Sequence, residues 1–251
     1  MKKHFSIPFA GLVALFAGCA TSVPPPRVDL TGKDPKAAWA RVLSTHVDGE
    51  GRIDFTGMAK ASDDLDVFVA WVAQNDPQSH PELFSTPPER LAFLLNSYNA
   101  LAMYNVLHAG VLPVDTVKFF YLRELQLGGR WISLYNYEND VIRKLGEERV
   151  HFALNCMVRA CPRLPQEPFL VESLDRQLDA AAREFFSKPL HVKVDDSART
   201  VHFSQILEFY TADFLAKAPS LIEYANRYRS TPIPTDYKVS FTPYDWTLNQ
   251  R

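Results

Sequence analysis

A long stretch without charged residues occupies the middle of the chain, from Leu91 to Leu107. It follows the sequence Thr86-Pro87-Pro88-Glu89. This predicts a helix start, because threonine is a favoured N-cap, proline suits the first turn and glutamate takes the capping-box position. The helix is expected to reach about His108 and to stop at Gly110. It is too polar for a membrane span, since it contains Asn96, Ser97, Asn99 and Asn105. The sequence therefore predicts a buried central helix around which one domain packs.

Shorter elements of both kinds surround this helix in the sequence. Apolar spacing and turn residues predict helices over 35–46, 63–75, 134–145, 174–187, 204–216 and 220–228. They predict strands over 150–155, 190–194, 200–203 and 237–241. Helices outnumber strands and the two are interspersed. We therefore expect an α+β fold, a single mostly helical domain over residues 35–251 with a small, largely antiparallel sheet.

The first eighteen residues have the pattern of an export signal. Lys2 and Lys3 precede an uncharged, mostly apolar run over residues 7–18, which is too short to span a bilayer. The run ends at Gly18-Cys19 and resembles a bacterial lipobox, with Phe16 where leucine is usual. The sequence thus predicts a signal peptide over 1–18 and lipidation of Cys19. The alternative is a plain secretory signal in which Cys19 has no role.

The next segment, residues 19–34, has the composition of a spacer. It contains three consecutive prolines and few apolar side chains, which predicts an extended tether between a lipid and the domain. Ala20 follows Cys19 where aspartate would mark inner-membrane retention. We therefore expect a lipid-anchored protein of the bacterial cell envelope, in the outer membrane and facing the periplasm. With 27 basic and 29 acidic residues, the charge gives no reason to expect a nucleic-acid partner.

A cysteine and a histidine lie close together in the sequence, at His151 and Cys156. A cysteine nucleophile needs a nearby base to form thiolate. However, a strand over 150–155 would place residues five apart about 16 Å from each other and on opposite faces. Only a sharp turn, or His202 as the base, would make Cys156 a nucleophile, with Asn155 or Glu138 orienting the histidine. The other interpretation is a structural disulfide between Cys156 and Cys161, since two remaining cysteines in an exported chain usually pair.

Polar residues of the central helix form a second candidate site. Asn96 and Asn99 share a helix face, and with Tyr98, Glu138 and Asn155 they are candidates to line a binding pocket. The alternative is that the asparagines bond to the backbone of neighbouring loops, as most polar side chains do. Because no phosphate loop, dinucleotide motif or metal-spaced histidine pair is found, no cofactor and no metal is expected.

Several segments together resemble one known family, the domain of unknown function 547 family. They are LSTHVDGEGRIDF (43–55), AFLLNSYNAL (92–101), SLYNYENDVI (133–142), HFALNCMVRACPRL (151–164), LDRQLDAAAREFF (174–186) and FTPYDWTLN (241–249). The resemblance runs from about residue 37 to 249 and departs at Leu94 and Leu95, where the family more often has tryptophan and isoleucine. It implies a fold shared with bacterial envelope proteins and some plant proteins, and no particular reaction. The matched positions are Asn96, Tyr98, Asn99, Glu138, His151, Phe152, Asn155, Cys156, Cys161, Pro162, Tyr244, Asp245, Trp246 and Asn249.

The sequence leaves two functions open. The first is an envelope lipoprotein that binds a peptide, glycan or partner protein in a polar pocket. The second is a cysteine-dependent hydrolase or acyl-transferase that acts on an envelope peptide or amide. In either case the predicted membrane contact is made through the lipid on Cys19.

Overall fold

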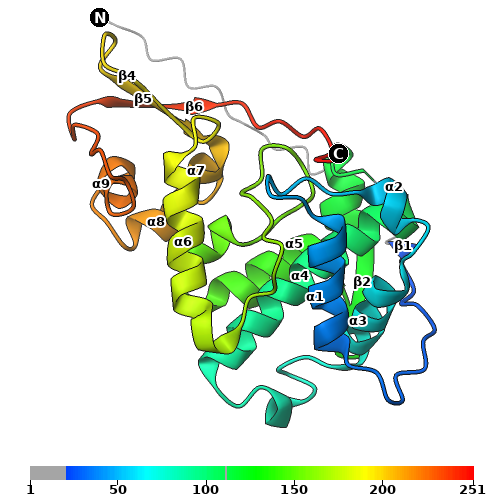
Figure 1. Ribbon diagram of the computed structural model, residues 1–251. Helices are drawn as coiled ribbons and strands as arrows, with labels where there is room; N and C mark the ends of the chain where they lie inside the picture. The colour runs from blue at the N-terminus through cyan, green and yellow to red at the C-terminus, as the bar shows by residue number, and fades with distance from the viewer. Residues whose placement is uncertain (1–20, 111) are drawn as a thin grey trace, which may run out of the picture.

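The computed structural model describes residues 21–110 and 112–251 (Figure 1). The predicted export signal and Cys19 lie outside the described residues. The fold is α+β, as predicted, and it is built around helix α4 (Pro87–Ala109). The Thr86 side chain accepts the Glu89 N–H, and the Glu89 carboxylate accepts the Thr86 N–H. Gly110 ends the helix in the left-handed conformation, with φ 61°. Both helix ends are thus where the sequence predicts them.

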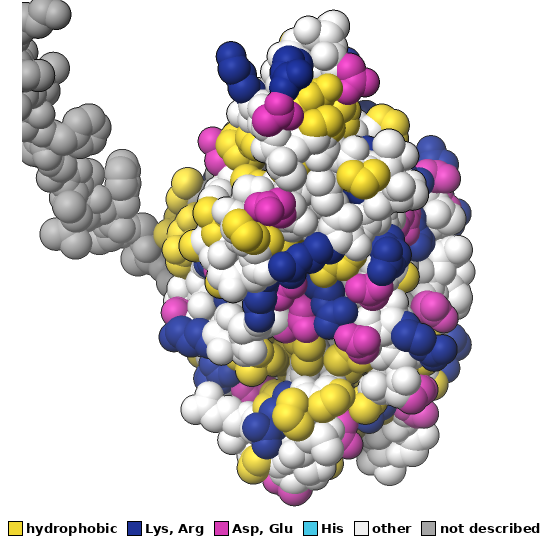
Figure 2. All heavy atoms as spheres, turned by 90° about the vertical axis from the view of Figure 1, so that its left-hand side faces the viewer, with side chains coloured by type: hydrophobic (Ala, Val, Ile, Leu, Met, Phe, Trp, Pro, Cys, Tyr) yellow, Lys and Arg dark blue, Asp and Glu magenta, His cyan; other side chains and the backbone are white. Residues whose placement is uncertain are grey.

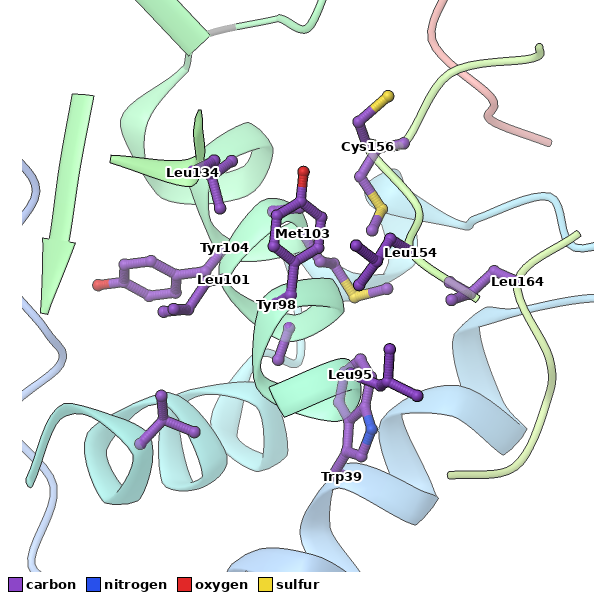
Figure 3. Packing of buried hydrophobic residues seen from close by; sticks show 14 of the residues in the cluster. Trp39, Leu95, Tyr98, Leu101, Met103, Tyr104, Leu134, Leu154, Cys156 and Leu164 are labelled. Carbon is purple, nitrogen blue, oxygen red and sulfur yellow. The ribbon is translucent and has the colours of Figure 1, made fainter. Parts of the chain in front are cut away.

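The first of two core clusters surrounds α4. Helices α1 (Pro35–His46) and α3 (Asp63–Gln74) pack against each other, and α3 packs on α4. Trp39 stacks on Phe68 with ring centroids 5.3 Å apart. Figure 3 shows Trp39 beside Leu95 of α4, and Cys156, Leu154 and Leu164 on the neighbouring loop segments. The loop that carries the cysteines therefore packs on the central helix.

Two small sheets lie at different places in the fold. The first contains β1 (Thr21–Ser22), β2 (Arg123–Leu127) and β3 (Arg130–Ser133). The second contains β4 (Val192–Asp195), β5 (Thr200–Ser204) and β6 (Lys238–Thr242). Each sheet joins an antiparallel hairpin to one parallel strand from far along the chain. The prediction of one largely antiparallel sheet is therefore wrong, because β1 and β6 pair in parallel with strands remote in sequence.

The second core cluster packs between the second sheet and α6 (Leu174–Ser187), α7 (Gln205–Phe209), α8 (Thr211–Leu215) and α9 (Leu221–Asn226). It is rich in aromatic rings and includes Phe152, whereas Val150 and Ala153 belong to the first cluster. The segment around residue 152 therefore lies where the two clusters meet. On the side of the molecule with α6 and α9, acidic and basic side chains are interspersed (Figure 2).

The remaining helical segments are short. They are α2 (Phe55–Met58), η1 (Pro81–Leu83), η2 (Val117–Leu122), α5 (Leu134–Asn136), η3 (Tyr137–Ile142), η4 (Arg143–Leu145), η5 (Glu148–Phe152) and η6 (Val171–Ser173). The predicted helix over 134–145 is present as the succession α5, η3 and η4. No helix among the described residues is long and apolar enough to cross a membrane.

The chain joins the domain earlier than the predicted boundary at residue 35. Thr21 and Ser22 pair with Arg123 and Glu124 in β2. Val23 is only 7% exposed and belongs to the first core cluster, and the Tyr104 hydroxyl donates to the Pro24 carbonyl at 3.0 Å. Residues 21–24 are therefore packed on the domain, where the sequence predicts an extended tether.

Candidate functional site

A cavity of about 60 Å³ lies between the two core clusters. Its polar lining consists of a carboxylate, an imidazole, two thiols and three phenols, and rings and aliphatic side chains complete the wall. There is room for a few water molecules. The polar residues are Tyr98, Glu138, His151, Cys156, Cys161, Tyr210 and Tyr244.

The backbone before Cys156 is not a strand. Residues 148–152 form the 3-10 helix η5, and an irregular loop follows. The strand prediction fails because the apolar alternation reflects burial in two separate clusters and not on two faces of a sheet. Without the strand, the separation of about 16 Å does not apply, and His151 and Cys156 line the same cavity.

Two asparagines fix the loop that carries the cysteines. The Asn99 Oδ1 atom accepts the backbone N–H of Asn155 at 2.8 Å, and its Nδ2 atom donates to the Ala153 carbonyl at 3.0 Å. The Asn155 side chain donates to the Pro162 carbonyl at 2.7 Å and accepts the Met157 N–H at 2.7 Å. Met157 itself has φ 69°, a left-handed conformation that is uncommon for a side chain of this kind. These bonds hold Cys156 and Cys161 in one compact turn.

His151 is only 3% exposed, and its ring is held at one nitrogen. Its Nε2 atom lies 2.8 Å from the Asp213 carboxylate, which also receives two hydrogen bonds from Arg143. The hydrogen bond from His151, together with Arg143, holds the pKa of Asp213 well below its usual range. An ionised Asp213 accepts the Nε2 proton, which leaves Nδ1 as the acceptor nitrogen.

The other ring nitrogen, His151 Nδ1, is buried and has no hydrogen-bond partner. The closest carboxylate oxygen, on Glu138, is 3.9 Å away, which is too far for a hydrogen bond. The Tyr210 ring stacks on the imidazole at a centroid distance of 3.8 Å and prevents it from tilting. An unpaired basic nitrogen is therefore presented at the cavity wall.

The sulfur atoms of Cys156 and Cys161 lie 3.1 Å apart. This exceeds the length of about 2.05 Å that a disulfide requires, and both residues are free thiols in the structure. The loop thus brings the sulfurs together as expected, but the predicted disulfide is not formed in the structure.

The surroundings of the two sulfurs differ. Cys161 Sγ accepts the Cys156 N–H at 3.2 Å and the Tyr244 hydroxyl at 3.4 Å. Burial raises the pKa of Cys161, but hydrogen bonds from the Cys156 thiol, Tyr244 and the backbone outweigh it and lower the pKa overall. The hydrogen bond to Cys161, followed by burial, raises the pKa of Cys156. When the pair loses one proton, these opposite shifts favour the negative charge on Cys161 and the remaining proton on Cys156.

Glu138 is buried among hydroxyl groups. Its carboxylate accepts the Tyr98 hydroxyl at 3.3 Å. Burial and the charge of Glu138 raise the pKa values of both Tyr98 and Tyr210. These phenols therefore stay neutral and act as hydrogen-bond donors.

The predicted binding residues do not assemble into one pocket. Tyr98 and Glu138 line the cavity, whereas Asn99 and Asn155 bond to the loop backbone. Asn96 lies in a separate apolar groove, where its Oδ1 atom accepts the Trp39 indole N–H at 3.1 Å and the Phe169 N–H at 3.0 Å. His202, the second candidate base, is on β5 and is not among the cavity-lining residues.

Asp213, Tyr210 and Tyr244 were not assigned to a site from the sequence. Asp213 and Tyr210 follow His151 by about 60 positions. Tyr210 lies between α7 and α8, and Asp213 lies on α8. No sequence motif relates residues at this separation to His151, so the sequence offered no reason to select them. Tyr244 stands in one of the segments that carry the family resemblance, and this was its only signal.

A larger cleft of about 590 Å³ meets the cavity at Cys161 and Pro162. Its walls carry charges of both signs, including Arg52, Arg159, Arg163, Lys188, Glu184 and Asp245. Cys161, the one cysteine of the pair that lines this cleft, is therefore shared between the small cavity and a hollow large enough for a peptide-sized group. No group of three potential ligands among the described residues could hold a metal ion.

Residues 83–186 match the family model described as protein of unknown function, DUF547. The match supports the resemblance to this family. It covers α4, the cysteine loop and α6, and it ends before Asp213 and Tyr244. No curated protein and no solved structure matches the chain.

Proposed function

We propose that this protein is a cysteine-dependent hydrolase or acyl-transferase that acts on an envelope peptide or amide. One observation carries the proposal: His151 Nδ1 is buried and unpaired at the cavity that Cys156 and Cys161 line, while Asp213 holds Nε2. A nucleophile, a base and a group that orients the base are the parts that such a reaction requires.

The base is set up by its neighbours. Asp213 fixes the tautomer, and Glu138, 3.9 Å from Nδ1, stabilises the imidazolium that forms when the ring takes a proton. His151 takes a proton from the cysteine pair through Cys156. The remaining charge settles on Cys161, where three hydrogen-bond donors stabilise it.

The reaction follows in two steps. The Cys161 thiolate attacks the acyl carbon, and a sulfur–carbon bond forms as the carbonyl electron pair moves to oxygen. Tyr244, whose hydroxyl lies 3.4 Å from Cys161 Sγ, donates to that oxygen. The leaving amine takes the proton from His151 and departs as the thioester forms. His151 then deprotonates water or an acceptor amine, which attacks the thioester and releases the thiolate.

The asparagine contacts favour an enzyme over a binding protein. Of the five residues predicted to bind a ligand, Tyr98 and Glu138 line the cavity. The side chains of the other three, Asn96, Asn99 and Asn155, are engaged by internal hydrogen bonds. Their role is to hold the cysteine loop and the wall of α4 in place. The polar groups that stay available in the cavity are those of general acid–base and nucleophilic chemistry.

The proposal includes an anchor in the bacterial envelope through a lipid on Cys19. It is supported by the short apolar run before Gly18-Cys19 and by the Pro-rich residues that follow. The outer membrane is the proposed location, because Ala20 replaces the aspartate of inner-membrane retention.

Trapping of the acyl group tests the enzyme. The reduced full chain is mixed with p-nitrophenyl acetate, and nitrophenolate release is followed while intact mass and peptide mapping locate the acetyl group. We expect a burst and acetylation at Cys161, both lost in Cys161→Ser and slowed in His151→Gln. Acetylation spread over surface lysines, with equal rates in both variants, would refute the proposal.

A further inference from the structure

We infer that one end of the domain rests directly on the lipid bilayer. The surface, called here the 112–135 patch, consists of exposed apolar and aromatic side chains. It comprises Leu112, Val114, Val117, Tyr121, Trp131 and Tyr135, which are 40 to 61% exposed. The inference rests on the proposed anchor at Cys19 and is independent of the proposed chemistry.

Exposed apolar side chains are concentrated in this part of the chain. Six of the fourteen large apolar residues that the described chain leaves exposed fall within residues 112–135. Val117 and Tyr121 are on the same short helix η2, and Tyr121 stacks on Tyr135 with ring centroids 4.4 Å apart. Scattered exposed apolar residues need no explanation, but their concentration in one segment of the fold favours an interaction surface.

The patch is next to the strand that begins the described chain. Element η2 contacts β2, β3 and α5. In the sheet, Trp131 pairs with Gln126 on β2, and Ser22 of β1 pairs with Glu124 on the other edge of β2. Leu125 and Ile132 fill the buried face, so Trp131 stands on the outward face of the same sheet, about 10 Å across from β1.

The short distance along the chain between β1 and the proposed lipid at Cys19 indicates that the patch contacts the membrane. Thr21 is two residues after Cys19, and two residues span at most about 7 Å. Thr21 cannot swing away from the domain, because β1 is paired with β2 and Val23 is buried in the core. A lipid on Cys19 would therefore hold β1 within that distance of the membrane surface, and the adjacent patch would meet the headgroup region.

The composition of the patch fits that environment. Tryptophan and tyrosine are enriched where a membrane meets water, because their rings are apolar while their N–H and O–H groups bond to water and headgroups. Valine and leucine side chains beside them gain by leaving water. The lipid anchor and the patch would together fix the orientation of the domain on the membrane.

The test uses fluorescence of the full chain, purified from membranes and reconstituted in vesicles of phosphatidylethanolamine and phosphatidylglycerol. Some vesicles carry brominated acyl chains that quench nearby tryptophan, and intact mass establishes whether Cys19 carries lipid. We expect brominated lipid to quench Trp131, and Trp131→Phe to lose most of that quenching. Val117→Asp should weaken the quenching, whereas the matched control Val239→Asp, on the exposed face of the second sheet, should leave it unchanged.

The outcomes separate the anchor from the surface. If the chain is lipidated but Trp131 is quenched by aqueous iodide and not by brominated lipid, the membrane contact of the patch is refuted. The lipid anchor at Cys19 is then still supported. Such a patch would be free to bind a protein instead. If the chain carries no lipid but still binds the vesicles with Trp131 quenched, the membrane contact of the 112–135 patch is supported and the lipid anchor at Cys19 is refuted. A chain without lipid and without vesicle binding overturns both.

Discussion

The side chain of Asn99 accepts the backbone N–H of Asn155 at 2.8 Å, across 56 residues of sequence. Through this contact the central helix α4 determines where the cysteine loop lies. The interior of the domain and the reactivity of the thiols are therefore coupled, and substitutions on α4 should affect both.

Asn99→Ala should destabilise the protein by about 1–3 kcal/mol, because the Asn155 N–H and the Ala153 carbonyl would be buried without partners. It should also slow thiol labelling in the folded protein. Denaturant unfolding and labelling rates check the two effects. Asn136→Ala, at an exposed position, is the control and should change neither. If Asn99→Ala is labelled at the wild-type rate, the contact from α4 does not influence the reactivity of the cysteine loop.

Asn96→Ala should cost a similar free energy, about 1–3 kcal/mol, because the Trp39 indole and the Phe169 N–H would lose their acceptor. Thiol labelling should stay unchanged, since Asn96 lies in a different groove. An unaltered unfolding midpoint would show that these hydrogen bonds contribute nothing to stability.

His191 should make the protein less stable in mild acid. Burial lowers the pKa of His191 from 6.5 to about 4. Between these values the unfolded chain binds a proton that the folded protein does not, so stability falls as pH decreases through this range. Between about pH 7 and about pH 5 the loss from this group is about 2 kcal/mol.

The variant His191→Phe, which can keep a ring stacked on Phe185, should remove that part of the pH dependence. His202→Phe is the control and should retain it. Denaturant unfolding at the two pH values provides the measurement. If the unfolding free energy changes equally with pH in all three proteins, His191 has the same pKa in the folded and the unfolded state.

Tyr244→Phe should shift the pH profile of thiol labelling upward. The Tyr244 hydroxyl donates to Cys161 Sγ, and its removal raises the pKa of Cys161, so less thiolate is present at neutral pH. Loss of one such hydrogen bond corresponds to about a tenfold change in the thiolate fraction. Tyr237→Phe, which alters an exposed hydroxyl bonded to Asp196, serves as control. If the pH profile of labelling is unchanged in Tyr244→Phe, Tyr244 does not stabilise the Cys161 thiolate.

Cys19→Ser should release the protein from the membrane fraction or leave its signal uncleaved, because only a cysteine can receive the lipid. Fractionation and intact mass of the two proteins make the comparison. A wild-type protein without lipid would refute the anchor.

The helix α4 was predictable because its start and end are local signals, a capping box and a left-handed glycine. The segment around His151 was not, because its shape depends on contacts with Asn99 and with both core clusters. The parallel strands β1 and β6 come from the two ends of the described chain, and apolar periodicity does not reveal such pairing.

Within the site, His151, Cys156, Cys161 and Glu138 could be singled out by residue type and by proximity in the sequence. Their relation could not, since the strand geometry assumed for 150–155 separated them. Asp213, which orients His151, is brought in by the packing of the second cluster. The local pattern thus named His151 as the base and Cys156 as the nucleophile, whereas the proposed chemistry places the attacking sulfur on Cys161. Only tertiary structure supplied Asp213 and the hydrogen bonds that distinguish the two cysteines.

The most direct test of the proposed chemistry is the rate at which iodoacetamide labels the cysteine pair in the folded, reduced protein. Wild type should be labelled at Cys161, the cysteine of the pair whose pKa is lowered. His151→Gln should be labelled at least about tenfold more slowly at neutral pH, while His202→Gln should match wild type. Equal rates in all three proteins, or a pair that reacts only after unfolding, would contradict a thiol activated by His151.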